Sequence, residues 1–290
     1  MGSERSIAWI SDVGRSDEVD TVNVLAPYAS SMRSALSAQA RIVALSLVLV
    51  ALAFAIGGGL LVGKLQLLTV FGISIQDRPA LLVLLSAIAL QGIAFGGVSL
   101  GYVAYAKRDR SFLNVRVPGI RDLILIATGF LALIVTLVVM SIVYYLLGIE
   151  SAENVIVEMG LQHPEIFLIM IPVSILLIGP GEELLFRGVI QGLLGEQFGW
   201  IVAVIISSVI FAGAHWIGLA GGGVLAHLFV LFALSLILGT IYEVSENLVV
   251  PALIHGAYNA LLFFFAYLTA VYGIEPASIG ALVLTSCSTC

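Results

Sequence analysis

The sequence is poor in charged residues. Only 10% of its 290 residues are Asp, Glu, Lys or Arg, whereas 60% are apolar. A soluble domain of this length could not cover its surface with so few polar side chains. Beyond Arg121 the only basic residue is Arg187, and nothing in the composition indicates nucleic-acid binding. The sequence therefore predicts an integral membrane protein whose surroundings are a lipid bilayer.

Cysteine is nearly absent: Cys287 and Cys290 are the only two, and both stand at the C-terminal end. They exclude a disulfide framework and a cysteine-based zinc site. The ending CSTC has the outline of a prenylation box, but its middle residues are not aliphatic, so we attribute it to chance. No cleavable signal peptide is visible, because the first 40 residues are polar and partly acidic. We expect them to form a loosely ordered tail.

Long apolar runs are abundant. A helix needs about 20 apolar residues to cross a bilayer, and runs of this kind occur near 42–63, 80–105, 122–147, 166–190, 200–219, 224–242 and 248–270. A further run, 278–284, is too short to span by itself. In the second run, Gly92-x₃-Gly96 and Gly97-x₃-Gly101 predict close helix packing. The predicted fold is all-α, a polytopic transmembrane helix bundle of seven to eight spans.

The distribution of basic residues predicts the orientation. Five of the twelve Lys and Arg residues lie between the second and third runs, and four precede the first run. The positive-inside rule makes this side cytoplasmic, so we expect a multi-pass cell-membrane protein with a cytoplasmic N-terminus. The expected organisation is a polar tail (1–40), N-terminal transmembrane helices without a catalytic motif (41–160), a catalytic transmembrane core (161–275) and a short C-terminal segment (276–290).

Charged residues interrupt the fourth apolar run at IGPGEELLFRGV (178–189). A charge near the bilayer centre costs about 2.5–3.5 kcal/mol on insertion scales, so Glu182, Glu183 and Arg187 need an explanation. Glu183 and Arg187 are four residues apart and can pair on one helix face. Pro180 predicts a break or kink just before the glutamates, which would lie in the first turn of a new helical segment.

Polar residues in two other predicted spans are expected to lie close to the glutamates. If the chain folds back near residue 199, the glutamates and His215 lie at the same height. His255 and Asn259, on the last span, are four residues apart and share one face. His227 is expected near the outer end of its span, away from this site.

The side-chain types of this predicted cluster suit hydrolysis. A glutamate close to a histidine can take a proton from water and later return it to a leaving amine. Histidine and asparagine side chains can donate hydrogen bonds to the oxyanion of a tetrahedral intermediate.

The motifs Glu182-Glu183-x₃-Arg187, Phe211-x₃-His215 and His255-x₃-Asn259 resemble, in order, the three motifs of the CPBP family of intramembrane proteases. That family includes the type II CAAX prenyl endopeptidases and the bacteriocin-processing and abortive-infection immunity proteins. The resemblance covers about 165–270. It implies an endopeptidase that cuts a protein or peptide substrate near the cytoplasmic membrane face, and in the prenyl-processing branch the substrate is a prenylated C-terminus.

The resemblance also implies roles for these residues. Glu182 would activate water with help from His215, Glu183 would be held by Arg187, and His255 with Asn259 would form the oxyanion pocket. Members of the family are often labelled metalloproteases. Glu182, His215 and His255 are permissible zinc ligands, but the chain has no His-Glu-x-x-His helix. Chemistry with zinc and chemistry without any cofactor therefore both remain open, and we favour the latter.

Two functions of other classes are compatible with parts of this pattern. Buried Glu, His and Arg also occur along the ion pathways of proton- or ion-coupled membrane transporters. A transporter would stagger its polar residues across the membrane and repeat its halves, whereas here the polar residues are predicted at one level. The other alternative is a non-catalytic immunity or scaffold membrane protein that retains the fold.

Overall fold

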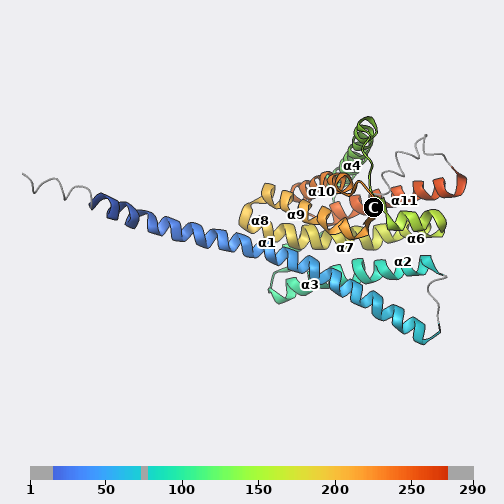
Figure 1. Ribbon diagram of the computed structural model, residues 1–290, viewed down its shortest axis with the longest axis horizontal. Helices are drawn as coiled ribbons and strands as arrows, with labels where there is room; N and C mark the ends of the chain where they lie inside the picture. Colours follow the sequence, from blue (N-terminus) through green and yellow to red (C-terminus); the bar gives the residue numbers. More distant parts are fainter. Residues whose placement is uncertain (1–15, 73–77, 274–290) are drawn as a thin grey trace, which may run out of the picture. The chain divides into compact units, whose positions relative to one another are not determined.

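The computed structural model of the protein describes residues 16–72 and 78–273, and nearly all of them are helical (Figure 1). The run 278–284 and both cysteines lie outside the described residues. In chain order the elements are α1 (Ser16–Val70), α2 (Pro79–Ala87), η1 (Ile88–Phe95), α3 (Gly96–Tyr105), η2 (Arg110–Leu113), α4 (Ile120–Leu147), β1 (Glu153–Asn154), α5 (Val155–Gln162), α6 (Glu165–Val173), η3 (Ser174–Ile178), α7 (Gly179–Glu183), η4 (Leu184–Gln191), α8 (Gly192–Phe198), α9 (Trp200–Ala214), η5 (His215–Gly218), β2 (Leu219–Ala220), α10 (Val224–Ser245) and α11 (Val249–Tyr272).

Seven spans long and apolar enough to cross a membrane occur in the described part of the chain, each overlapping one predicted run. Their bounds are Ala35–Val70, Pro79–Tyr105, Ile120–Leu147, Glu165–Phe198, Trp200–Gly218, Val224–Ser245 and Val249–Tyr272. The spans expose large apolar side chains such as Val48, Leu131 and Ile205. Exposed apolar surface of this kind is what a bilayer covers. The predicted all-α transmembrane bundle is therefore confirmed.

The first helix is longer than expected. Residues 16–40, predicted as a loosely ordered tail, belong to α1. Polar composition alone did not exclude helix here, because Ser, Asp and Glu are common in a helix's first turns. The contacts divide the chain into two units, Met1–Leu45 and Ser46–Cys290, and the architecture below concerns the second.

Two spans alternate between α- and π-helical geometry: α2–η1–α3, and α6–η3–α7–η4–α8. The sequence suggested a break or kink just before the glutamates, but the helix continues through Pro180 without a break. The backbone passes from the π-helical η3 directly into α7, with Pro180 in the first turn of α7. Proline has no N–H to donate, so it fits a position where the hydrogen-bond register changes. Glu182 lies in that first turn, as predicted.

Glycines bring α11 against the span that carries the glutamates. A Cβ at Gly179 would lie 2.5 Å from the Ala252 carbonyl oxygen, and one at Gly256 would lie 2.8 Å from the Ser174 carbonyl oxygen. Only hydrogen fits at these positions, so the backbones approach closely. The packing predicted for the second span is wrong at Gly96, Gly97 and Gly101, where an added Cβ would meet nothing within 4 Å.

The loop between α3 and α4 is tied to distant helix ends by arginines. Arg108 donates two 2.7 Å hydrogen bonds to the carboxylate of Glu196, and these bonds raise the pKa of Arg108. Arg116 donates two hydrogen bonds to the carboxylate of Asp122, and it also donates one to the Ser245 carbonyl oxygen. These contacts join the start of α4 and the end of α10, beside the turn that leads into α11.

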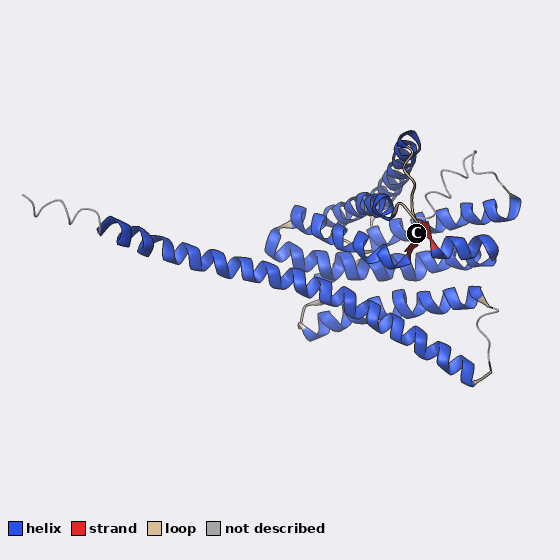
Figure 2. Ribbon diagram, viewed as in Figure 1, coloured by secondary structure: helices blue, strands red, loops and turns tan. Residues whose placement is uncertain are grey.

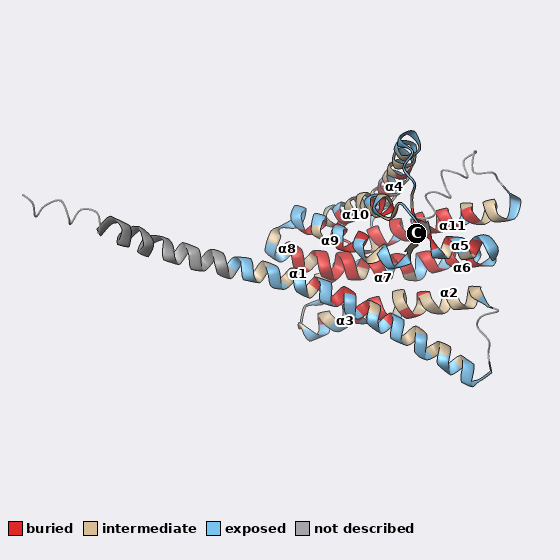
Figure 3. Cartoon of the chain, viewed as in Figure 1, coloured by how far each residue is buried: buried red, intermediate tan, exposed pale blue. Residues whose placement is uncertain are grey.

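The segment 148–165, between the third and fourth predicted apolar runs, contains secondary structure. It includes α5 and the two-residue strand β1, which pairs antiparallel with β2 in the register Glu153↔Ala220 and Asn154↔Leu219 (Figure 2). Strands this short carry no detectable periodicity, so they could not be predicted from the sequence. In Figure 3 the buried residues concentrate along α7 and α11, the two helices that carry most of the polar motifs.

Candidate active site

A buried ionic cluster occupies the contact between the fourth and last spans. The guanidinium Nη1 of Arg187 lies 3.1 Å from Glu183 Oε1, as the four-residue spacing predicted. The same oxygen is 2.8 Å from Nδ1 of His255 on α11. Arg187 is 1% exposed and Glu183 is fully buried. One carboxylate oxygen therefore joins the guanidinium to the imidazole inside the bundle.

The Arg187 side chain has further partners that the sequence did not reveal. Its Nη2 lies 3.0 Å from the hydroxyl of Ser235 on α10. The guanidinium also stacks over the Phe211 ring, 4.7 Å from its centroid. Buried charges require such partners because desolvation is expensive. Ser235 gave no sequence signal, since a lone serine in an apolar span is common.

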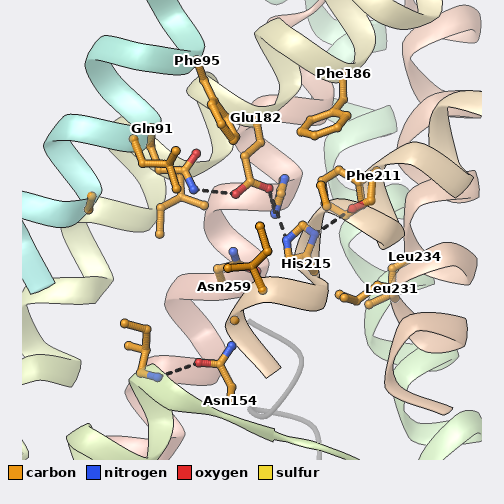
Figure 4. Close-up of a pocket in the computed structure, with 18 of the residues that line it drawn as sticks. Gln91, Phe95, Asn154, Glu182, Phe186, Phe211, His215, Leu231, Leu234 and Asn259 are labelled. Atoms are coloured by element: carbon orange, nitrogen blue, oxygen red, sulfur yellow. Dashed lines mark hydrogen bonds and ion pairs between the residues drawn. The ribbon is translucent and has the colours of Figure 1, made fainter. Parts of the chain in front are cut away.

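Glu182 faces both histidines. Its Oε2 atom lies 3.8 Å from Nε2 of His215 and 3.8 Å from Nε2 of His255. Its other oxygen, Oε1, accepts a 2.8 Å hydrogen bond from Gln91 Nε2. Figure 4 shows Gln91, Glu182 and His215 directed toward one another. The predicted convergence of residues 182, 215 and 255 is present, and Gln91 of η1 is an addition from outside the motifs.

The orientation of each imidazole is fixed by its Nδ1 atom. Nδ1 of His215 lies 2.8 Å from the carbonyl oxygen of Phe211, one turn earlier on α9. Nδ1 of His255 contacts Glu183. A carbonyl and an ionised carboxylate only accept hydrogen bonds, so the hydrogen of each neutral ring is on Nδ1. The two Nε2 atoms then present lone pairs toward Glu182 Oε2.

These groups line a cavity of about 420 Å³. Most of its other lining residues are apolar, among them Phe95, Phe186 and Leu234 (Figure 4). Asn259 is buried and lines the same cavity. A mainly apolar cavity with a few convergent polar groups is the usual form of a small-molecule or peptide site.

The expectation that His227 lies away from the site is wrong. His227 also lines this cavity. Its Nδ1 is 3.2 Å from the Ala152 carbonyl oxygen, so the ring holds the segment before β1 against α10. A position counted along one helix could not reveal that a distant loop folds over the cavity.

Among the described residues, no group of three His, Cys, Asp or Glu side chains is arranged to hold a metal ion. The permissible zinc ligands predicted from the sequence are Glu182, His215 and His255. Ligands of a tetrahedral zinc ion with bonds of about 2.0–2.1 Å lie about 3.4 Å apart, compared with 3.8 Å here. For Glu182 and either histidine to share one ion, the two atoms would have to move closer by a few tenths of an ångström.

Comparison with known proteins adds independent information. A family model described as "Type II CAAX prenyl endopeptidase Rce1-like" matches residues 164–261, about a third of the chain. No curated protein and no solved structure matches the chain significantly. The matched segment includes all three polar motifs, while Gln91 lies outside it. The resemblance to CPBP proteases is therefore confirmed, and this membrane protein contains a domain of the Rce1-like type II CAAX prenyl endopeptidase family at residues 164–261.

Proposed function

We propose that the protein is an intramembrane endopeptidase that hydrolyses a peptide bond with water activated by Glu182. The observation that carries the proposal is that two imidazole Nε2 atoms lie at the same 3.8 Å distance from one oxygen of Glu182. This separation is too long for direct hydrogen bonds. It suits a shared water molecule, which could lie about 2.8 Å from all three atoms.

In the proposed reaction, Oε2 of Glu182 accepts a proton from this water as the oxygen attacks the scissile carbonyl carbon. The carbonyl π electrons move to the carbonyl oxygen and form a tetrahedral oxyanion. Glu182 then gives the proton to the leaving nitrogen as the C–N bond breaks, which restores the carboxylate. His215 holds the water, since its ring is fixed by the Phe211 carbonyl.

His255 and Asn259 are the proposed donors to the oxyanion. The amide of Asn259 can donate directly. His255 can donate from Nε2 only when it carries hydrogens on both ring nitrogens. Glu183 lies against Nδ1 and fixes the orientation of the ring. Arg187, anchored to Ser235, keeps the Glu183 carboxylate in place.

The proposed substrate is a protein or peptide whose apolar part enters the cavity, and the family resemblance favours a prenylated C-terminus. The cytoplasmic membrane face is the proposed place of cleavage, with the N-terminus on the same side. The basic residues between α3 and α4 support this orientation.

The proposal is tested with purified protein in bilayer nanodiscs and a prenylated peptide that carries a fluorophore and a quencher on either side of the expected cleavage site. Glu182→Gln keeps the size of the side chain but removes the base. We expect it to lower kcat at least about 10³-fold, the scale of a lost base together with its electrostatic support. Glu158→Gln, at an exposed position on α5, is the matched control and should turn over normally.

Equal turnover by wild type and Glu182→Gln would refute the catalytic assignment. Absence of turnover in both would favour a non-catalytic scaffold or a transporter. Incubation of the wild type with a chelator, followed by added zinc, forms a second arm. We expect turnover to survive the chelator; loss that zinc reverses would show that a metal takes part.

A further inference from the structure

The residue that fixes the reactive oxygen of Glu182 comes from the N-terminal half of the chain. Gln91 lies in η1, outside the family-matched segment 164–261. Its Nε2 donates a 2.8 Å hydrogen bond to Glu182 Oε1. Because a carboxylate is only an acceptor, the amide must turn its NH₂ group toward it. Oε2 is then the oxygen left to face the imidazoles.

Loss of this bond would remove a direct constraint on the rotation of the Glu182 carboxylate. Gln91 donates a direct hydrogen bond to Glu182, whereas the nearest ring nitrogens of both histidines are 3.8 Å from this carboxylate. The terminal torsion of a glutamate is broad and nearly two-fold, so packing alone does not select one oxygen. Reacting groups must be held in a narrow range of orientations for efficient attack.

The backbone around Gln91 is built for this approach. The carbonyl oxygen of Gln91 contacts the position that a Cβ would occupy at Gly181, directly before Glu182. Glycine at 181 therefore lets η1 come close enough for an amide to reach the glutamate. Gln91 also lies in a π-helical segment, and such segments are frequent at functional sites.

The other end of the Gln91 amide argues against a purely structural role. Its Oε1 atom is buried and has no hydrogen-bond partner in the described part of the chain. A buried acceptor without a partner is destabilising, and an apolar residue of similar size would avoid it. Stability alone therefore gives no reason for a glutamine here, whereas the bond to Glu182 does.

We propose that Gln91 is a positioning residue that orients Glu182 for catalysis, so that the N-terminal spans complete the active site of the family domain. The inference rests on the proposed function. It implies that residues 164–261 by themselves would hold an incompletely ordered base.

The test uses full-length protein with Gln91→Leu, which removes the donor at similar volume, and Gln91→Asn, which keeps the amide on a shorter arm. We expect Gln91→Leu to lower kcat about 10–100-fold, the usual effect of losing a supporting hydrogen bond, with KM changed less than about threefold. Gln91→Asn should recover part of the loss. The matched control is Thr128→Ala, at an exposed position on α4 whose hydroxyl donates to carbonyl oxygens of its own helix; it should leave kcat and KM unchanged.

Infrared spectra give a readout that needs no turnover. The bands of the Glu182 carboxylate are identified from the difference between wild type and Glu182→Ala. We expect these bands to shift in Gln91→Leu and to stay in place in Thr128→Ala. In Gln91→Leu, unshifted bands or a kcat equal to that of the wild type would overturn the inference, as would an equal loss of activity in Thr128→Ala. An inactive wild type would refute the proposed function alone, because the infrared arm still decides the role of Gln91.

Discussion

Removing the Arg187 guanidinium should lower the thermal stability of the protein, because it leaves a buried carboxylate without its cationic partner. Arg187→Leu removes the guanidinium partner of the fully buried Glu183 carboxylate and leaves its contact with Nδ1 of His255. It also removes the hydrogen bond to Ser235 and the stacking on Phe211. Breaking a buried pair by removing one partner typically costs about 3–5 kcal/mol. For a chain of this size, we expect an apparent Tm lower by on the order of 10 °C.

The double variant Glu183→Leu/Arg187→Leu distinguishes an unpaired charge from a packing defect. Replacing both members of a buried pair by apolar residues is often neutral or stabilising. We therefore expect the double variant to recover at least about half of the lost Tm. Its turnover should nevertheless be lower than that of the wild type, because His255 has lost the acceptor at Nδ1.

Thermal unfolding in detergent micelles, followed by tryptophan fluorescence, measures both variants. Arg121→Leu is the matched control, since this exposed arginine donates one hydrogen bond, to the Val244 carbonyl oxygen; its effect should stay below about 1 kcal/mol. An Arg187→Leu protein as stable as the wild type would refute the reasoning. So would a double variant less stable than Arg187→Leu.

Two further predictions concern the packing of α11 and the membrane orientation. Gly179→Ala should lower turnover about 10–100-fold, because its Cβ would lie 2.5 Å from the Ala252 carbonyl and displace the helix that carries His255. Gly96→Ala, with nothing within 4 Å, is the control, and equal turnover in both variants would contradict the close-packing argument. The orientation is tested with single cysteines in a chain whose Cys287 and Cys290 are changed to serine. The two positions are Ser111, before the span α4, and Gln162, after it, so the proposed topology places them on opposite sides of the membrane. In right-side-out vesicles an impermeant thiol reagent should label Gln162→Cys and spare Ser111→Cys, and the reverse pattern would invert the proposed topology.

The sequence alone determined the class of fold and the polar motifs. Apolar runs of membrane-spanning length reveal helices without any knowledge of their neighbours, because the bilayer requires each span to satisfy its own backbone hydrogen bonds. The spacing of four residues predicted the Glu183–Arg187 pair, and a turn near residue 199 brought His215 to Glu182. Both inferences use contacts that are local to one helix or one hairpin.

Only the tertiary structure decided what surrounds the motifs. Gln91 meets Glu182 across 91 positions of sequence, and Ser235 meets Arg187 across 48. Single polar residues in apolar spans have no periodicity that assigns them a partner. His227 contacts the Ala152 carbonyl oxygen and lines the cavity, and both facts depend in the same way on how distant segments pack. Helix contacts at long sequence separation depend on the shapes of both surfaces, such as the space left by Gly179, Gly181 and Gly256, and that information is absent from any one segment.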